Sequence, residues 1–201
     1  MMFVVARNPS LMELRPMTQL RLLGLSGSLR RASNGTAVLR GLQDALAPKA
    51  TLDIFSLHGL PLYNEDDDGE HAPESVRALR SAIETTDGVI MVSPEYNHGM
   101  SGVLKNALDW ASRPAFTSVM AYKPVAIMAT SRGALGGARC LEHLRVALDS
   151  MLSRVALARE VIITSSADKI RDARLIDETS LGFACGAVEA LLHEIEMWRR
   201  A

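Results

Sequence analysis

The sequence has little of what defines secreted, membrane-spanning or nucleic-acid-binding proteins. Cys140 and Cys185 are its only cysteines, and two isolated cysteines build neither a disulfide framework nor a metal site. The formal net charge is -1, so no global excess of positive charge attracts nucleic acid or anionic lipid. No apolar run approaches the roughly 18 residues that a membrane span needs. We therefore expect a cytoplasmic protein with no membrane span, no nucleic-acid partner and no bound metal.

The length and composition predict one globular domain. The chain has 201 residues, of which 48% are hydrophobic and 22% charged, which is enough to bury a full core. Residues 1–18 begin with a short apolar stretch that lacks a basic leader and is followed by Arg7, Pro9 and Glu13. This pattern predicts a flexible N-terminal extension rather than a signal peptide. Residues 19–201 are then the single folded domain.

Short aliphatic runs alternate with amphipathic segments along this domain. The runs predict five strands, at residues 20–25, 51–55, 89–92, 124–130 and 161–164. Apolar residues at helical spacing predict helices between these strands and a terminal helix over 179–198. Strands that are apolar throughout are typical of a parallel sheet covered on both faces. We predict a doubly wound α/β fold, in which ligands bind beyond the carboxyl ends of the strands.

The loop after the first predicted strand has the composition of a phosphate-binding turn. Glycine allows close approach of the backbone, hydroxyls donate hydrogen bonds, and the following helix start presents free N–H groups. An arginine adds a forked donor that suits phosphate. The pattern is neither a Walker loop nor the dinucleotide fingerprint, and a polar turn without a ligand remains the alternative. The candidate residues are Ser26, Ser28, Arg30, Ser33 and Asn34.

Two further loops have features that suit a flat ring. After the third strand come Pro94, Glu95, Tyr96 and Asn97, in which proline stiffens the backbone and tyrosine offers a flat wall with a polar tip. After the fourth strand come Ser131 and Gly133 in a glycine-rich helix entry. A capped turn or a packing device would explain either loop alone. Together with the first loop, they predict a site for a mononucleotide with a flat head.

These stretches resemble the NADPH-dependent FMN reductase family over about residues 20 to 195. The matching segments are 24–30, 61–66, 93–99, 102–114, 131–133 and 136–137. The resemblance implies a flavodoxin-like fold with non-covalent FMN, NADPH or NADH as co-substrate, and a homodimer or homotetramer. It also implies that Ser28, Arg30 and Ser33 hold the phosphate, that residues 94–97 line the isoalloxazine largely through main-chain atoms, and that Ser131 contacts the ring or ribityl chain. The asparagine that the family often carries at the position of Gly35 is missing, and Asn34 stands one place earlier.

The expected activity is hydride transfer from NAD(P)H through bound FMN to a small-molecule electron acceptor. Quinone, free flavin, an azo compound and a metal oxyanion are all open as acceptors. The cofactor carries such chemistry, so we predict no catalytic side chain, and we interpret His98 as structural or solvent-facing. The acidic run at 65–68 is predicted to be a solvated loop. The alternatives are a flavodoxin-type carrier with a protein redox partner and a flavin-free protein that has kept the fold.

Overall fold

The structure, a computed structural model, describes residues 19–47, 49–134 and 136–200. The predicted extension at 1–18 lies outside the described residues. The centre is a parallel sheet of β1 (Leu20–Ser26), β2 (Ala50–Phe55), β3 (Gly88–Tyr96) and β5 (Pro124–Thr130), in the order β2-β1-β3-β5. The edge beyond β5 is divided between β6 (Arg154–Val155) and β7 (Val161–Ile163), which pair with opposite ends of β5. With the short β4 (Gly99–Met100), the sheet has seven strands.

The predicted doubly wound parallel sheet is confirmed, whereas the predicted count of five strands is too low. All five predicted strands are present, and the last of them is β7. The unpredicted β6 pairs with the same edge of β5 and is separated from β7 by residues 156–160. Both β4 and β6 have two residues, too few to show a periodic pattern.

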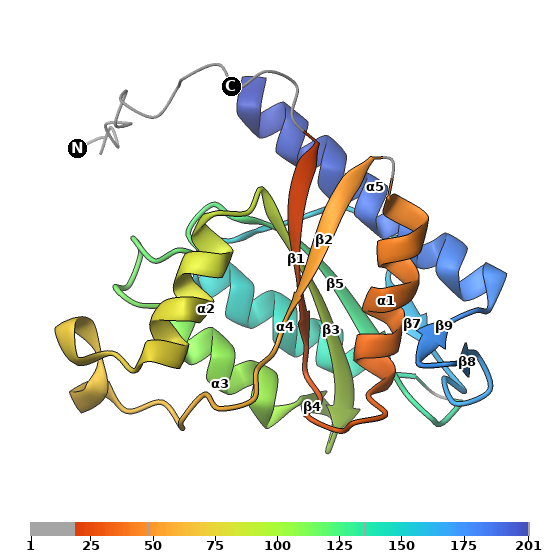
Figure 1. The fold of residues 1–201 in the computed structure, drawn as a ribbon, viewed down its shortest axis with the longest axis horizontal. Coiled ribbons are helices and arrows are strands. Elements are labelled where there is room, and N and C mark those ends of the chain that lie inside the picture. The colour runs from red at the N-terminus through yellow and green to blue at the C-terminus, as the bar shows by residue number, and fades with distance from the viewer. Residues whose placement is uncertain (1–18, 48, 135, 201) are drawn as a thin grey trace.

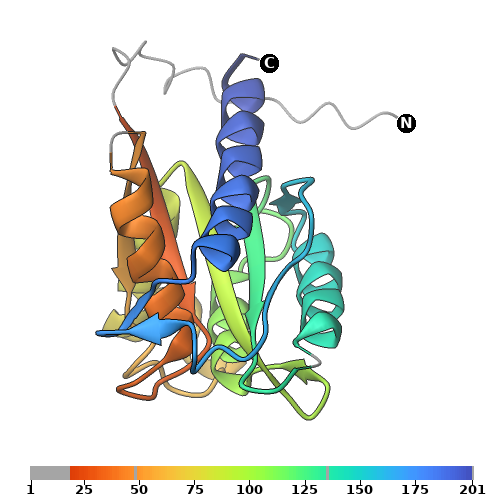
Figure 2. The ribbon, with the colours of Figure 1, turned by 90° about the vertical axis from the view of Figure 1, so that its right-hand side faces the viewer.

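In the part of the chain that the structure describes, five α-helices cover the two faces of the sheet. They are α1 (Asn34–Leu46), α2 (Glu74–Glu84), α3 (Gly102–Ala111), α4 (Ala138–Ser150) and α5 (Glu178–Arg200). Helices α1 and α5 lie on one face, and α2, α3 and α4 lie on the other (Figure 1). Figure 2 shows α5 running along the sheet beside α1. Among the described residues, no helix combines the length and apolar character that a membrane crossing requires.

Each face of the sheet has its own hydrophobic core. In β3, Ile90 and Val92 pack with α1 and α5, whereas Val89 and Met91 pack with α2, α3 and α4. All four side chains are fully buried. Successive residues of a strand point to opposite faces, so a strand covered on both sides is apolar throughout. This explains why the sequence shows an unbroken aliphatic run here.

A small hairpin covers one side of α1. Strands β8 (Ile170–Arg171) and β9 (Arg174–Leu175) are joined by Asp172 and Ala173, which have φ values of 50° and 57°. Two residues with positive φ are the signature of a type I′ turn. A Cβ added to Gly41 of α1 would lie 2.9 Å from the Leu175 carbonyl oxygen, so glycine permits this close packing. Its strands have two residues each, too few to leave a periodic pattern in the sequence, so the hairpin was not predicted.

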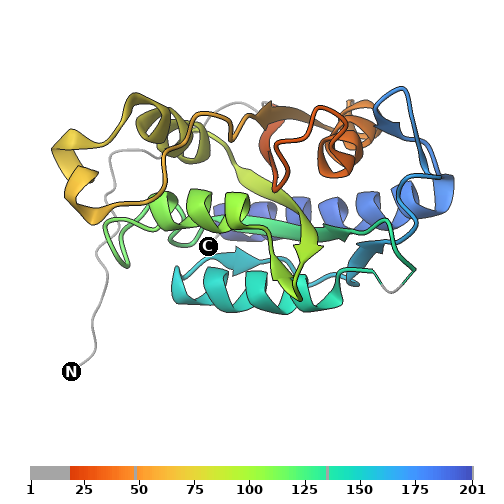
Figure 3. The same cartoon turned by 90° about the horizontal axis from the view of Figure 1, so that it is seen from below.

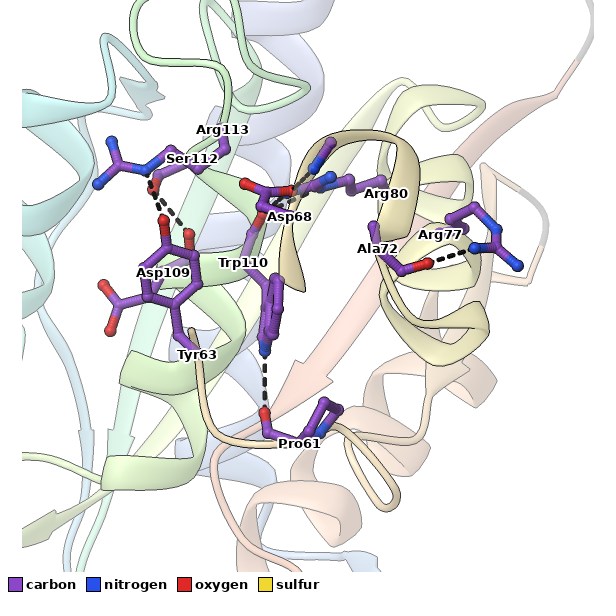
Figure 4. Close-up of polar contacts among 11 residues, drawn as sticks. Pro61, Tyr63, Asp68, Ala72, Arg77, Arg80, Asp109, Trp110, Ser112 and Arg113 are labelled. Atoms are coloured by element: carbon purple, nitrogen blue, oxygen red, sulfur yellow. Dashed lines mark hydrogen bonds and ion pairs between the residues drawn. The ribbon is translucent and has the colours of Figure 1, made fainter. Parts of the chain in front are cut away.

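The loop between β2 and α2 is held in place by contacts around Trp110 at the end of α3 (Figure 4). This loop contains two short 3-10 helices, Glu65–Asp67 and Gly69–His71. The Trp110 indole N–H donates to the Pro61 carbonyl at 2.9 Å. The Tyr63 ring packs edge-on against the indole, with 4.9 Å between the two ring centroids. Arg80 of α2 donates both to the Trp110 carbonyl and to the Asp68 carboxylate.

The prediction of a solvated acidic loop is therefore wrong at Asp68. Residues 65–67 are exposed as expected, but the Asp68 side chain is only 14% exposed and lies 2.8 Å from Arg80. Burial would raise the pKa of Asp68, but hydrogen bonds from Arg80 and the Gly69 N–H, with the charge of Arg80, lower it overall. Arg80 lies 12 residues farther along the chain, in α2, so the acidic run by itself gives no sign of the pairing.

We expect Asp68→Asn to lower the free energy of unfolding by about 1 kcal/mol at neutral pH, because the hydrogen bond from Arg80 loses its charge assistance. Since the folded pKa lies below the ordinary 3.8, this stabilisation is complete above that pH and is lost as the pH falls through the folded pKa. Urea unfolding of both proteins from neutral pH down to about pH 2, which covers the range over which aspartates titrate, should show the difference shrinking in acid. A constant difference would contradict the assignment, and the exposed Asp66→Asn serves as control.

Candidate functional site

The loops after β1, β3 and β5 meet at the edge where the parallel strands end (Figure 3). They enclose a pocket of about 250 Å³, called here the flavin-loop pocket. Most of the predicted site residues line it: Ser28, Arg30, Asn34, Pro94, Glu95, Tyr96, Ser131 and Gly133. Thr130, Arg132 and Gly35 also line it and were not predicted. Ser26, Ser33 and Asn97 are not part of its lining.

One end of the pocket carries positive charge and hydrogen-bond donors. Arg30 forms no ion pair with any carboxylate of the described residues. Helix α1 begins beside it, and the 13-residue helix directs the positive end of its dipole at this loop. Free N–H groups, a guanidinium and the Ser28 hydroxyl are the donor set that a phosphate requires.

Two of the predicted site residues, Ser26 and Ser33, stabilise the loop after β1 without lining the pocket. The hydroxyls of Ser26 and Ser33 lie 3.0 Å apart and are buried. Ser33 is the N-cap of α1 and accepts from the Thr36 N–H at 3.1 Å. Both residues therefore fix the loop and the helix start, and their contact with a ligand stays a prediction.

Gly35 has no room for the asparagine that the family often places there. An added Cβ would lie 2.8 Å from the Ser26 hydroxyl oxygen and 3.2 Å from the Val92 carbonyl oxygen. Asn34 instead lines the pocket, and its side-chain amide donates to the Ser166 hydroxyl at 2.6 Å. Asn34 thus connects the first loop to the loop that follows β7.

The second wall is the end of β3 and its turn into β4. Asn97 and His98 have φ values of 49° and 64° and form a two-residue turn between the paired Tyr96 and Gly99. Asparagine tolerates such left-handed backbone, which explains its place in the turn. Tyr96 lines the pocket while 52% exposed, so its ring is open to a ligand.

Glu95 caps a helix with its side chain. Its carboxylate accepts from the Cys140 N–H at 3.2 Å, in the first turn of α4, where a negative charge is favourable. The N-cap of that helix is Gly137, which makes no side-chain capping bond. Because the carboxylate is engaged at α4, we expect Glu95 to face a ligand through its main chain.

The third wall is joined to the loop after β7 by main-chain hydrogen bonds. Ser166 N–H donates to the Ser131 carbonyl at 3.0 Å, and Ser165 N–H donates to the Gly133 carbonyl at 3.2 Å. Ser165 and Ser166 were not predicted, although the hydroxyl-rich run 164–166 directly follows the fifth strand. A Cβ added to Gly133 would meet only the Ser131 hydroxyl, at 3.6 Å.

Neither cysteine nor histidine provides an acid or base inside this pocket. Burial raises the pKa of the Cys140 thiol to about 11, so the thiol is inert as a nucleophile. His98 is 71% exposed, lies 3.5 Å from Glu95 and contacts Arg139. These contacts confirm its interpretation as structural or solvent-facing.

The pocket fits FMN, which consists of a phosphate, a ribityl chain and a flat ring system. Phosphate donors lie at one end, in Ser28, Arg30 and the start of α1. Pro94 and Tyr96, from the end of β3, offer flat contacts, and Gly133, from the loop after β5, leaves its backbone open. A concave site with a few convergent polar groups and a flat wall is typical of a cofactor pocket.

Comparison with known proteins gives the same result. Residues 20–168 match the family described as NADPH-dependent FMN reductase. The chain is 37% identical over 183 residues to an NAD(P)H-dependent FMN reductase of Pseudomonas aeruginosa, covering 90% of this chain and 96% of the relative. It is 37% identical over 179 residues to a quinone reductase of Escherichia coli K12, covering 86% of this chain and 93% of that relative.

A solved structure shares the fold. It is the flavoenzyme NAD(P)H:(acceptor) oxidoreductase FerB from Paracoccus denitrificans, with a TM-score of 0.76 and 30% identity over 89% of this chain and 98% of that one. The fold and site therefore define a flavodoxin-like flavoprotein oxidoreductase that uses FMN and NAD(P)H. The chain belongs to the NADPH-dependent FMN reductase family.

Proposed function

We propose that this protein transfers a hydride equivalent from NAD(P)H to a quinone, which also takes up one proton from water, giving NAD(P)⁺ and the hydroquinone. The observation that carries the proposal is the flavin-loop pocket, which has phosphate donors at one end and the exposed Tyr96 at the other. When bound, FMN supplies the hydride-accepting and electron-donating chemistry. The quinone assignment is supported by the relative from Escherichia coli, which is named a quinone reductase.

The protein's own residues bind and orient. Ser28, Arg30 and the start of α1 would hold the phosphate of FMN, and the backbone of residues 94–96 would face its ring system. Tyr96 offers a flat, half-exposed surface beside which a planar acceptor can stack. The ionisable side chains of the lining are Arg30, Arg132, Glu95 and Tyr96. Glu95 is engaged at α4, and Tyr96 is assigned to stacking. We therefore assign no general acid or base to a side chain of the pocket.

Anaerobic stopped-flow measurement tests the proposal. The FMN-loaded protein is reduced with NADPH or NADH, and then mixed with a benzoquinone, free FMN, an azo dye or chromate. We expect rapid reduction and fastest reoxidation by the quinone. Faster reoxidation by another small acceptor would overturn the quinone assignment alone. Failure of both nicotinamides, together with single-electron exchange with a redox protein, would identify an electron carrier instead.

We expect Arg30→Ala to weaken FMN binding by about 1.5–3 kcal/mol, the range for a hydrogen bond to a charged group. Fluorescence titration of the apoprotein with FMN measures the affinity. Arg171→Ala is the matched control, because Arg171 is exposed in β8 and lines no part of this pocket. An unchanged affinity in Arg30→Ala would remove Arg30 from the phosphate site.

The quaternary structure stays a prediction from the family. We propose a homodimer or homotetramer located in the cytoplasm, and light scattering of the FMN-loaded protein measures the assembly.

A further inference from the structure

A second cavity adjoins the flavin-loop pocket and has no role in FMN binding as proposed above. It has a volume of about 480 Å³ and lies between the loop after β1, helix α1 and the segment that follows β2. Arg30, Arg31 and Arg40 line it, and we call it the arginine pocket. Ser28 and Arg30 line both cavities, so the two adjoin at this loop.

The arginine pocket carries uncompensated positive charge. Its lining contains three arginines and His58 but no aspartate or glutamate. Within the described part of the chain, none of these arginines forms an ion pair, whereas Arg80, Arg154 and Arg174 each pair with a carboxylate. The whole chain has a net charge of -1, so this concentration of one sign is local. A concave cationic surface attracts and holds an anion.

The remaining lining suits the rest of a nucleotide. Leu29, Ile54, Phe55 and Leu57 contribute apolar walls, and Ser56 and Thr36 contribute hydroxyls. Apolar walls with a few polar groups are what a flat heterocycle and its sugar require. The cavity thus combines recognition of a phosphate with space for a base.

We propose that the arginine pocket binds the 2′-phosphoadenosine end of NADPH and makes the enzyme prefer NADPH to NADH. The inference rests on the proposed function, in which a nicotinamide reaches the flavin-loop pocket next door. Arg31 and Arg40 line the arginine pocket and are absent from the lining of the flavin-loop pocket, so they can recognise the 2′-phosphate without touching FMN. Arg40 is half-buried in α1, where its main-chain oxygen accepts from Arg174, and this contact does not need the Arg40 side chain.

The test uses the FMN-loaded protein with Arg31→Gln, Arg40→Gln and the double variant. Glutamine keeps a long polar side chain and a helix propensity close to that of arginine. We measure kcat/KM for NADPH and NADH with one quinone, and we measure binding of 2′,5′-ADP by calorimetry. Arg159→Gln is the control, since Arg159 is exposed and lines neither cavity.

We expect each substitution to lower kcat/KM for NADPH about tenfold through KM, which corresponds to one charge-assisted contact. The value for NADH and the affinity for FMN should change less than about twofold, since neither presents a 2′-phosphate. Binding of 2′,5′-ADP should weaken in parallel, and the control should match the parent protein.

Three results would overturn the inference alone. They are equal losses for both nicotinamides, unchanged 2′,5′-ADP binding in the double variant, or 5′-AMP and inorganic phosphate binding as tightly as 2′,5′-ADP. The last would indicate a general anion site. Oxidation of neither nicotinamide by the FMN-loaded parent protein would instead remove the proposed function, and this inference with it.

Discussion

Replacing Trp110 with alanine should lower the free energy of unfolding by about 4 kcal/mol, within the range measured for truncation of buried tryptophan. The Trp110 side chain is fully buried and packs with Ala72 and Val76. Its indole N–H donates a hydrogen bond to the Pro61 carbonyl, and its ring packs against the edge of the Tyr63 ring. Truncation would leave a cavity and detach the loop before α2 from the end of α3. Urea unfolding monitored by circular dichroism measures the loss.

Trp110→Phe separates packing from hydrogen bonding. It retains much of the apolar contact but leaves the Pro61 carbonyl without the indole N–H, so we expect a loss of about 1–2 kcal/mol. FMN affinity per folded molecule should change less than about threefold in either variant, since α3 begins near the flavin loops and Trp110 lies at its other end. A loss below about 1.5 kcal/mol for Trp110→Ala would contradict the structural role.

Local patterns in the sequence predicted the central strands and all five α-helices. β1, β3 and β5 are buried on both faces and leave aliphatic runs that periodicity detects. The Trp110 contacts left no such trace, because Trp110 lies 49 residues from Pro61 and 30 residues from Arg80 in the chain. No local pattern shows that the exposed acidic run ends in a partly buried ion pair. The sequence therefore predicts the layers of this fold well and its long-range polar contacts poorly.

The candidate site shows the same division. Glycine, hydroxyl and arginine residues after β1, β3 and β5 identified the loops that meet in the pocket. The contact between Asn34 and Ser166 joins residues 132 positions apart, and Glu95 caps a helix that begins 43 residues later, at 138. The sequence predicts that Ser26 and Ser33 contact a ligand, but in the structure their hydroxyls contact each other. Loop composition predicts which loops meet in the pocket and not which of their side chains line it.

The glycine-rich loop that follows β5 leads to the second large expected effect. Gly136 has a φ of +77°, and an added Cβ would lie 2.2 Å from Ile162 Cγ2 of β7. We expect Gly136→Ala to lower the free energy of unfolding by about 3 kcal/mol, combining left-handed strain of 1–2 kcal/mol with overpacking of 1–3 kcal/mol. FMN affinity should also fall, because Ser131 and Gly133 in the same loop form a wall of the pocket.

Gly186→Ala is the control for this substitution. Gly186 is exposed within α5, and an added Cβ meets nothing within 4 Å. Alanine there should stabilise the protein by up to about 1 kcal/mol and leave FMN binding unchanged.

The two causes of the Gly136 effect are separable with Ile162→Ala, which removes the colliding methyl group but leaves the positive φ. In a double-mutant cycle of unfolding free energies, Gly136→Ala should cost about 1–2 kcal/mol less in the Ile162→Ala background than in the parent. If the collision also displaces the pocket wall, FMN affinity should recover in the double variant. Additive stabilities would contradict the collision and leave backbone strain as the whole cost. Recovery of both quantities would show that the packing of this loop against β7 determines the shape of the flavin-loop pocket.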